Sequence, residues 1–350
     1  MITSKRFWIS IIITLVFMIM FFERTSLNKT LESLSSVNYM YVLIGAMIYL
    51  SSMIWRVIRW KLILNPCGNF TILRLSPVML VGYATNNLLP IRIGEFIKAY
   101  YLHKREGINP STALATILIE RIFDGLTLIF FIGIVSLSLP IFELFQAIAN
   151  QTNINWLTLT LGLTIPFLMA IVLLTIISFH PKILTYILSY FLKILPKKWQ
   201  EKINSYSSYF FEGLSALKSP LTLSLIFSCS ILIWLSEALV YLVIALGFDF
   251  QDFIPNIKTL TSIMILTTAT SNLGTAIPST GGGIGPFEFF SQTTLMFFNI
   301  PVPLASAFTL VLHGALLIPI TIIGISYMWL NSISLRQISV TDKKFQIREE

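Results

Sequence analysis

Long apolar runs are the feature that most constrains how this chain can fold. Of its 350 residues, 55% are hydrophobic and 11% are charged, which is less than half of the roughly 25% charged residues of a soluble domain. The runs are longer and more uniform than the segments of about ten alternating residues that build outer-membrane barrels. The sequence therefore predicts an all-α integral membrane protein, a polytopic helical bundle, and excludes soluble, secreted and disordered classes.

Six apolar segments approach or exceed the roughly 20 residues that a spanning helix needs. They are residues 7–22, 39–55, 111–139, 156–179, 221–248 and 303–330. The first resembles a signal peptide, but Glu23 and Arg24 follow it where a small-residue cleavage site would stand, so we expect an uncleaved anchor helix. Two further segments, 72–90 and 260–299, are apolar but contain Asn, Thr, Gly and Pro. This composition favours two re-entrant, broken helices.

The basic residues indicate the orientation. If the N-terminus is cytoplasmic and both irregular segments re-enter, 20 of the 24 Lys and Arg residues lie in inside loops, Arg56, Arg59 and Lys98 among them. Three lie outside, and Arg121 is within a span. This asymmetry follows the positive-inside rule. It predicts a multi-pass protein of the cell (inner or plasma) membrane with both termini cytoplasmic, and it accounts for the net charge of +8 without a nucleic acid partner.

These assignments divide the chain into five regions. The regions are an anchor helix with an outside loop (1–38), a first repeat with its re-entrant segment at 72–96 (39–155), a connecting span with a cytoplasmic basic loop (156–218), a second repeat with its re-entrant segment at 260–299 (219–331), and a cytoplasmic polar tail (332–350). In the basic loop, residues 181–195 carry apolar side chains at helical spacing, which predicts an interfacial amphipathic helix.

The two irregular segments resemble each other. Residues 84–88 read ATNNL and residues 269–273 read ATSNL, and each stretch is followed by a proline, a glycine and then Glu-Phe. The first segment enters from the cytoplasm and the second from outside, which predicts an inverted-topology repeat, as in many secondary transporters. Broken helices at membrane depth survive when they are buried in protein or line a wet cavity. We therefore expect a polar site between the repeats, with Asn87 and Asn272 at its two breaks.

The first polar cluster of this expected site runs from Pro90 to Glu95. Pro90 ends a helix and Gly94 permits a tight turn. Arg92 offers a forked, permanently charged donor that suits phosphate, and Glu95 either pairs with it or begins the next helix. The plainer alternative is a topological arginine at the inner interface.

The second cluster is the run PSTGGGIGP at residues 278–286. Gly281, Gly282, Gly283 and Gly285 would let successive backbone N–H groups converge on an anion, with Glu288 in the first turn of the next helix. The run is not a nucleotide-binding P-loop, because no Gly-Lys-Ser/Thr follows it. The alternative is a flexible loop.

Other charges lie inside spans. Glu120, Arg121 and Asp124 share one span, and a single charge at mid-membrane costs about 2.5–3.5 kcal/mol on insertion scales. The three charges therefore imply either a wet cavity or a structural ion-pair clamp. Glu237 lies in another span without a local partner; it could contact Arg92 or Arg121, titrate, or serve in packing. No Cys/His cluster has metal spacing, so we expect no metal and no cofactor, and we interpret His313 as a hydrogen-bonded packing residue.

Three of these motifs together resemble the lysylphosphatidylglycerol synthase transmembrane-region family, also called flippase-like domain proteins. The motifs are residues 87–95, 120–124 and 277–288, and the resemblance covers about residues 39–330. One departure is the triple glycine at 281–283, where the family more often has Pro-Gly-Gly. The multiple peptide resistance factors of this family make and flip aminoacylated phosphatidylglycerol and carry a large soluble aminoacyltransferase domain. The resemblance implies their membrane half alone, and therefore lipid translocation or headgroup handling without aminoacyl transfer.

Three functions are open at this stage. A lipid translocase would hold an anionic phospholipid or polyprenyl-phosphate headgroup between the Arg92 turn and the glycine run. A membrane-embedded headgroup transferase would use Glu95, Glu120 or Asp124 as a base, but no long cytoplasmic loop offers a donor site, so we expect no enzyme activity. A scaffold for envelope lipid enzymes would not need mirrored polar breaks. A second copy of the chain and envelope-biosynthesis enzymes are candidate partners.

Overall fold

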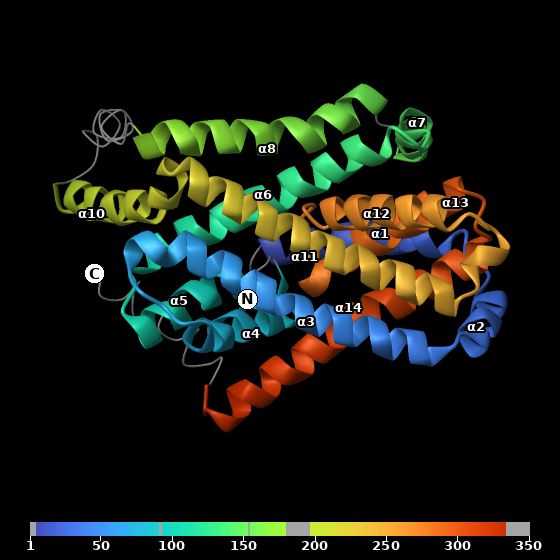
Figure 1. The fold of residues 1–350 in the computed structure, drawn as a ribbon, viewed down its shortest axis with the longest axis horizontal. Helices are drawn as coiled ribbons and strands as arrows, with labels where there is room; N and C mark the ends of the chain where they lie inside the picture. Colours follow the sequence, from blue (N-terminus) through green and yellow to red (C-terminus); the bar gives the residue numbers. More distant parts are fainter. Residues whose placement is uncertain (1–4, 91–92, 153–154, 180–196, 334–350) are drawn as a thin grey trace.

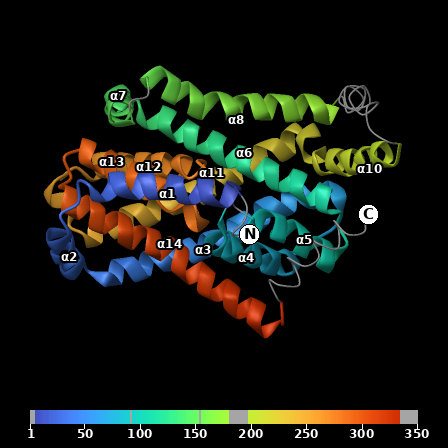
Figure 2. The ribbon, with the colours of Figure 1, turned by 180° about the vertical axis from the view of Figure 1, so that it is seen from behind.

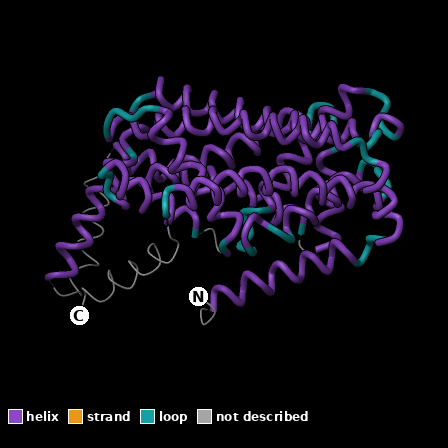
Figure 3. Tube along the Cα trace, turned by 90° about the horizontal axis from the view of Figure 1, so that it is seen from below, coloured by secondary structure: helices purple, strands orange, loops and turns teal. Residues whose placement is uncertain are grey.

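The computed structural model describes residues 5–90, 93–152, 155–179 and 197–333 of the chain. These residues form helices joined by turns and loops, with no strand among them (Figure 3). The all-α class predicted from the apolar runs is therefore confirmed. The predicted amphipathic helix at 181–195, most of the polar tail and Arg92 lie outside the described residues.

Helices cover every one of the apolar runs, and further helices lie between them. The helices are α1 (Lys5–Phe22), α2 (Leu27–Ser36), α3 (Tyr39–Leu64), α4 (Ile72–Leu88), α5 (Gly94–Glu106), α6 (Pro110–Val135), α7 (Ile141–Thr152), α8 (Trp156–Phe179), α10 (Lys197–Gly213), α11 (Pro220–Gly247), α12 (Ile257–Gly274), α13 (Pro286–Phe297) and α14 (Val302–Leu330). Local sequence fixes several of their ends. At the start of α6, for example, the Asn109 side chain accepts a hydrogen bond from the backbone N–H of Ser111 and Pro110 takes the first helical position, as capping preferences predict.

Among the described residues, three helices are long and apolar enough to cross a membrane. They are α3 with the short turn that follows it, α11 and α14. The α1 and α2 helices together would make a fourth span, bent by 83°. The α6 helix is as long as α3, at 26 residues, but its middle carries the charges of Glu120, Arg121 and Asp124. The apolar helices agree with a membrane location.

The antiparallel pair of α3 and α11 forms the centre of the bundle. A Cβ atom at Gly45 of α3 would lie 3.0 Å from the Ile244 side chain of α11, so the missing side chain allows a close approach. Further along, Arg59 of α3 donates to Ser230 of α11 at 2.8 Å. The α4 and α5 helices lie toward one end of this pair, and α1, α12 and α13 lie toward the other end (Figures 1 and 2).

Two helical hairpins, α4–α5 and α12–α13, each pack on a helix from the other half of the chain. The α4 helix packs on α14, where a Cβ atom at Gly324 would lie 2.4 Å from the Cβ of Ala84, and α12 packs on α6. The loop of the second hairpin reaches the end of α4, because a Cβ atom at Gly281 would lie 2.5 Å from the carbonyl oxygen of Asn87. The breaks of the two hairpins therefore meet inside the bundle.

Candidate functional site

Arg59 is the centre of a buried group of charges between α3, α5 and α6. Its Nη1 is 2.6 Å from Asp124 Oδ1, and its Nη2 is 3.7 Å from Glu120 Oε1. Lys98 donates to the other oxygen of Glu120 at 2.5 Å and lies 3.8 Å from the ring centre of Trp60. We term Arg59, Lys98, Glu120 and Asp124 the buried ion cluster; all four are at most 6% exposed. Two cations balance two carboxylates, so the net charge of the cluster is neutralised within the protein.

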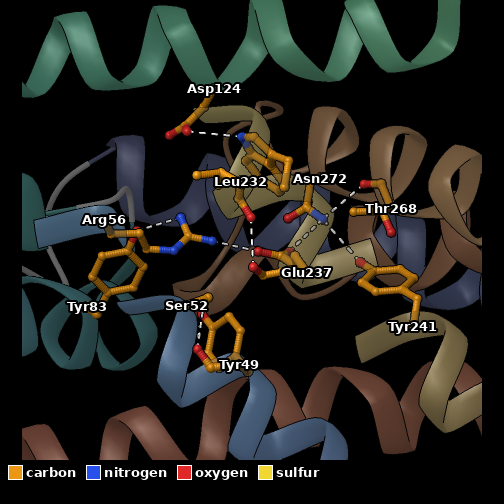
Figure 4. Close-up of polar contacts among 12 residues, drawn as sticks. Tyr49, Ser52, Arg56, Tyr83, Asp124, Leu232, Glu237, Tyr241, Thr268 and Asn272 are labelled. Atoms are coloured by element: carbon orange, nitrogen blue, oxygen red, sulfur yellow. Dashed lines mark hydrogen bonds and ion pairs between the residues drawn. The ribbon is translucent and has the colours of Figure 1, made fainter. Parts of the chain in front are cut away.

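A second ion pair joins α3 to α11. Arg56 donates to Glu237 Oε2 at 2.6 Å and to the hydroxyl of Tyr83 at 2.9 Å. The other oxygen of Glu237 accepts a hydrogen bond at 3.0 Å from Asn272, which also donates to the hydroxyl of Tyr241 (Figure 4). A continuous polar chain thus runs from α4 through α3 and α11 to α12.

Three basic residues do not lie where the sequence places them. The predicted assignment of Arg56, Arg59 and Lys98 to inside loops is wrong, because all three are at most 5% exposed within the bundle. The span predicted to end at residue 55 continues to Leu64, which carries both arginines inward. Their burial is offset by the facing carboxylates. For the same reason Glu237 pairs with Arg56, whereas Arg121 contacts Glu95 and Asp124; Arg92 lies outside the described residues.

The polar chain borders a space of about 290 Å³ inside the bundle, which we term the central cavity. Six predicted site residues line it: Asn87, Arg121, Asp124, Glu237, Asn272 and Gly282. A second cavity of about 260 Å³ shares part of this wall, including Arg121, and is lined by Glu95 and Gly283 as well. Since one water occupies about 30 Å³ in the liquid, each space can hold several waters or a small polar headgroup.

Among the described residues, Arg121 is the cation that lines both cavities. Its Nε is 2.8 Å from Glu95 Oε1, and its Nη1 is 3.5 Å from Asp124 Oδ2. The Arg121 side chain is 32% exposed, against 4% for the Arg56 side chain. Its Nε–H has no aligned hydrogen-bond acceptor among the described residues. The Nε atoms of Arg56 and Arg59 are buried in the same state, so Arg121 differs from them by its partly exposed guanidinium, whose terminal N–H groups can donate to a ligand.

The glycine turn, which we define as Gly281–Gly283, has a backbone that glycine adopts most easily. Two of its residues have φ values of +75° and +83°, in the left-handed region. The backbone N–H of Gly285, just after the turn, donates to Glu288 Oε2 at 2.7 Å. The expectation that this N–H joins an anion-binding nest is therefore wrong, because the protein's own carboxylate already occupies it. The predicted place of Glu288 in the first turn of α13 is confirmed.

His313 of α14 lies beside the glycine turn. Its Nδ1 is 2.5 Å from Glu288 Oε1, and its Nε2 is 3.1 Å from the carbonyl oxygen of Gly282. The ring stacks on Phe287 with 4.0 Å between ring centres. The prediction of a hydrogen-bonded packing residue is thus correct about its bonds, but it misses that His313 also lines the central cavity.

Some predicted site residues are packed away from the cavities. A Cβ atom at Gly94 would lie 2.4 Å from the backbone nitrogen of Asn86, so Gly94 closes the α4–α5 hairpin. Glu120 belongs to the buried ion cluster, and Gly281 abuts the end of α4. Within the part of the chain that the structure describes, no group of three or more His, Cys, Asp and Glu residues could hold a metal ion.

Sequence reasoning missed Arg56 and Arg59, although one signal could have found them. They are three residues apart, so they lie on one face of a helix. The apolar positions Trp60, Ile63 and Leu64 continue that helix beyond the predicted end and are fully buried. A helix that continues past two arginines with a large apolar face indicates that those arginines are buried with it.

Comparisons with known proteins place the chain among membrane proteins. A family model described as "Lysylphosphatidylglycerol synthase TM region" matches residues 7–324. The UPF0104 membrane protein MJ1595 of Methanocaldococcus jannaschii is 30% identical over 128 residues, which cover 35% of this chain and 38% of that relative. The matched part is thus well under half of the curated relative. No solved structure matches the chain.

Proposed function

The chain belongs to the lysylphosphatidylglycerol synthase TM region family, and on this premise we propose that it is a lipid translocase. The cargo is an anionic phospholipid or a polyprenyl-phosphate-linked lipid. Its headgroup passes through the central cavity while its tails stay in the bilayer. The observation that carries the proposal is a charged cavity inside an apolar helical bundle.

The space beside Arg121 and Glu95 supports the proposal that a ligand binds there. Charged side chains inside a membrane are costly and usually mark a path for a substrate or an ion. A purely structural clamp needs only opposite charges in contact, as in the buried ion cluster. The pair of Arg121 and Glu95 differs, because both side chains border the second cavity and are 32% and 23% exposed.

The polar groups of the cavity support an anionic, phosphate-bearing headgroup. Arg121 presents a planar guanidinium, which suits the oxygens of phosphate better than an ammonium does. Asn86 lines the second cavity as well, but its Oδ1 is buried beside Gly94. Arg121 is therefore the group that supports a phosphate-bearing headgroup.

The packing of the helices supports an inverted repeat. The matching stretches 84–88 and 269–273 both lie at the C-terminal ends of helices, α4 and α12. Each hairpin packs on the last helix of the other unit, α4 on α14 and α12 on α6. This reciprocal exchange is what a two-fold axis between α3–α6 and α11–α14 produces, with both hairpins re-entering and the cavities between them.

Surface labelling tests this topology. Single cysteines at Asn87 and Lys104 should react from the cytoplasmic side or be shielded near it, and those at Lys258 and Asn299 should react from outside. These variants are made in a background without Cys67 and Cys229, and a membrane-impermeant thiol reagent is applied to intact cells and to inverted vesicles. Labelling of the Lys258 and Asn299 positions from opposite sides would refute the second re-entrant hairpin and the inverted repeat.

Lipid movement in liposomes tests the proposed function. The purified protein should speed the transbilayer movement of labelled phosphatidylglycerol or polyprenyl phosphate more than that of labelled phosphatidylcholine. Ala276→Phe places a ring at a position that lines both cavities, so it should slow that movement several-fold. The matched control is Ile322→Phe, which adds a ring at a position that is 58% exposed on α14 and borders neither cavity.

The same liposomes separate the alternatives. If the protein is a headgroup transferase, the labelled lipid changes in mass when a donor is supplied. If the protein is a scaffold, neither mass nor sidedness changes, and Ala276→Phe behaves like Ile322→Phe. Either result would contradict the translocase proposal.

A further inference from the structure

Glu288 and His313 form a closed set of contacts at the cavity wall that the proposed function leaves unused. Both residues are at most 5% exposed. Glu288 Oε1 is 2.5 Å from His313 Nδ1, and Glu288 Oε2 accepts from the backbone N–H of Gly285. On the other side of the imidazole, Nε2 is 3.1 Å from the carbonyl oxygen of Gly282. The pair thus ties α13 and α14 to the glycine turn.

The geometry fixes how many protons this pair holds. The carbonyl of Gly282 can only accept, so His313 Nε2 must carry a hydrogen. The contact between His313 Nδ1 and Glu288 Oε1 also needs a hydrogen, carried by one atom or the other. The pair therefore holds one proton more than a neutral imidazole beside a carboxylate would hold. Stacking of the imidazole on Phe287 suits either arrangement of that shared proton.

We propose that Glu288 and His313 are a proton-binding site that holds the glycine turn in place, and that loss of the proton releases the turn. A neutral imidazole has one N–H and here faces two acceptors. The charged carboxylate of Glu288 forms the stronger hydrogen bond, so it keeps the remaining hydrogen on Nδ1. The carbonyl of Gly282 then faces a lone pair on Nε2 and loses its donor.

Release of the glycine turn changes the cavity wall. Gly282 lines both cavities, and Gly281 abuts the carbonyl of Asn87 at the break of the first hairpin. Movement of the turn therefore alters both the shape of the cavity and the contact between the hairpins. A ligand that binds better to one position of the turn changes the affinity of the Glu288–His313 pair for its proton. By linkage, binding of the proton changes the affinity of the cavity for that ligand by the same factor. This coupling to lipid rests on the proposed function, whereas the proton site itself does not.

The other titratable groups around the central cavity are not needed for this proton exchange. The titratable side chains that border the same cavity come from α3, α4, α6 and α11, and they are Tyr49, Arg56, Tyr83, Arg121, Asp124 and Glu237. Tyr241 of α11 lies behind Phe287, with 6.4 Å between ring centres. Each of these charges already has an opposite partner: Arg56 pairs with Glu237, Asp124 with Arg59, and Arg121 with Glu95. Imidazole is also the side chain that exchanges protons near neutral pH.

Hydrogen–deuterium exchange of the purified protein in lipid nanodiscs tests the proton site without any transport assay. Exchange is compared at pH 6 and pH 8 after correction for the chemical exchange rate. Peptides that cover the glycine turn should lose protection at the higher pH by about fivefold, the change expected when one hydrogen bond is lost. Peptides from α3 serve as the internal control and should show no change.

Two variants separate the proton site from a general effect of pH. In Glu288→Gln the amide donates to His313 Nδ1 and still accepts from Gly285, so the turn should stay protected at both pH values. In His313→Leu the turn should be unprotected at both. Protection of the native turn that does not change with pH, or a Glu288→Gln turn that still responds to pH, would overturn the proposal. If His313→Leu does not fold, the native protein and Glu288→Gln decide.

A failure of this test is distinct from a failure of the proposed function. If the native protein moves lipid in liposomes but the protection of its glycine turn does not change with pH, the proton site alone is refuted. A turn that responds to pH in a protein that moves no lipid would support the proton site and refute the translocase.

Discussion

Arg59→Leu protein is expected to fold poorly in the membrane. The substitution removes the guanidinium that lies 2.6 Å from Asp124 and 3.7 Å from Glu120. Asp124 would keep its contacts with the indole N–H of Trp234 and with the more distant Arg121. These two contacts are too weak to balance the charge of a carboxylate that is only 6% exposed. Removal of one partner from a buried ion pair typically costs about 3–5 kcal/mol. That is a large part of the total stability of about 5–15 kcal/mol that proteins have.

The yield of monodisperse protein after extraction and the midpoint of thermal unfolding measure this effect. Arg24→Leu is the control, because it removes the same side chain from an exposed position. The double variant Arg59→Leu with Asp124→Asn should regain part of the stability, since it removes the stranded charge and leaves Glu120 paired with Lys98. If Arg59→Leu alone unfolds at the temperature of the parent, the buried ion cluster does not stabilise the fold.

The helices could be predicted from the sequence because their causes are local. Apolar runs set their positions, and caps such as Asn109 with Pro110 set their ends. The predicted end of the span at residue 55 failed because Arg56 looks like a charge at the membrane surface. Its partner Glu237 is 181 positions away in sequence, and no local pattern shows that the two side chains meet.

The candidate site could be predicted only in part, for the same physical reason. Asn87, Asn272 and Gly282 were found because a break in an apolar helix is itself a local signal. The roles of the charges depend on which helices pack together. Arg121 and Asp124 are three residues apart, yet Asp124 faces Arg59 at 2.6 Å, whereas Arg121 lies 3.5 Å from it and closer to Glu95. One helix thus carries both a structural carboxylate and a cavity cation.

Because of this division, we expect substitution of Arg121 to impair function and not folding, the opposite of the result expected for Arg59. Arg121→Ala protein should fold, because Asp124 keeps Arg59 and because Glu95 is 23% exposed to the cavity. It should nevertheless lose lipid movement. A hydrogen bond to a charged group contributes about 1.5–3 kcal/mol, so loss of one such contact to a phosphate slows translocation about tenfold or more. Arg121→Lys should recover part of the rate, since an ammonium keeps the charge but not the forked geometry.

The liposome assay and the unfolding midpoint are measured together for these variants. The double variant Glu95→Gln with Arg121→Ala is the matched control. It removes both charges of the pair, so no unpaired charge is left in the second cavity. If charge imbalance alone causes the loss, the double variant regains movement; if the guanidinium binds the headgroup, the double variant remains inactive. A stable Arg121→Ala protein that moves lipid at the native rate would contradict a role for this cation in translocation. An unfolded one would place Arg121 with Arg59 among the residues that hold the helices together.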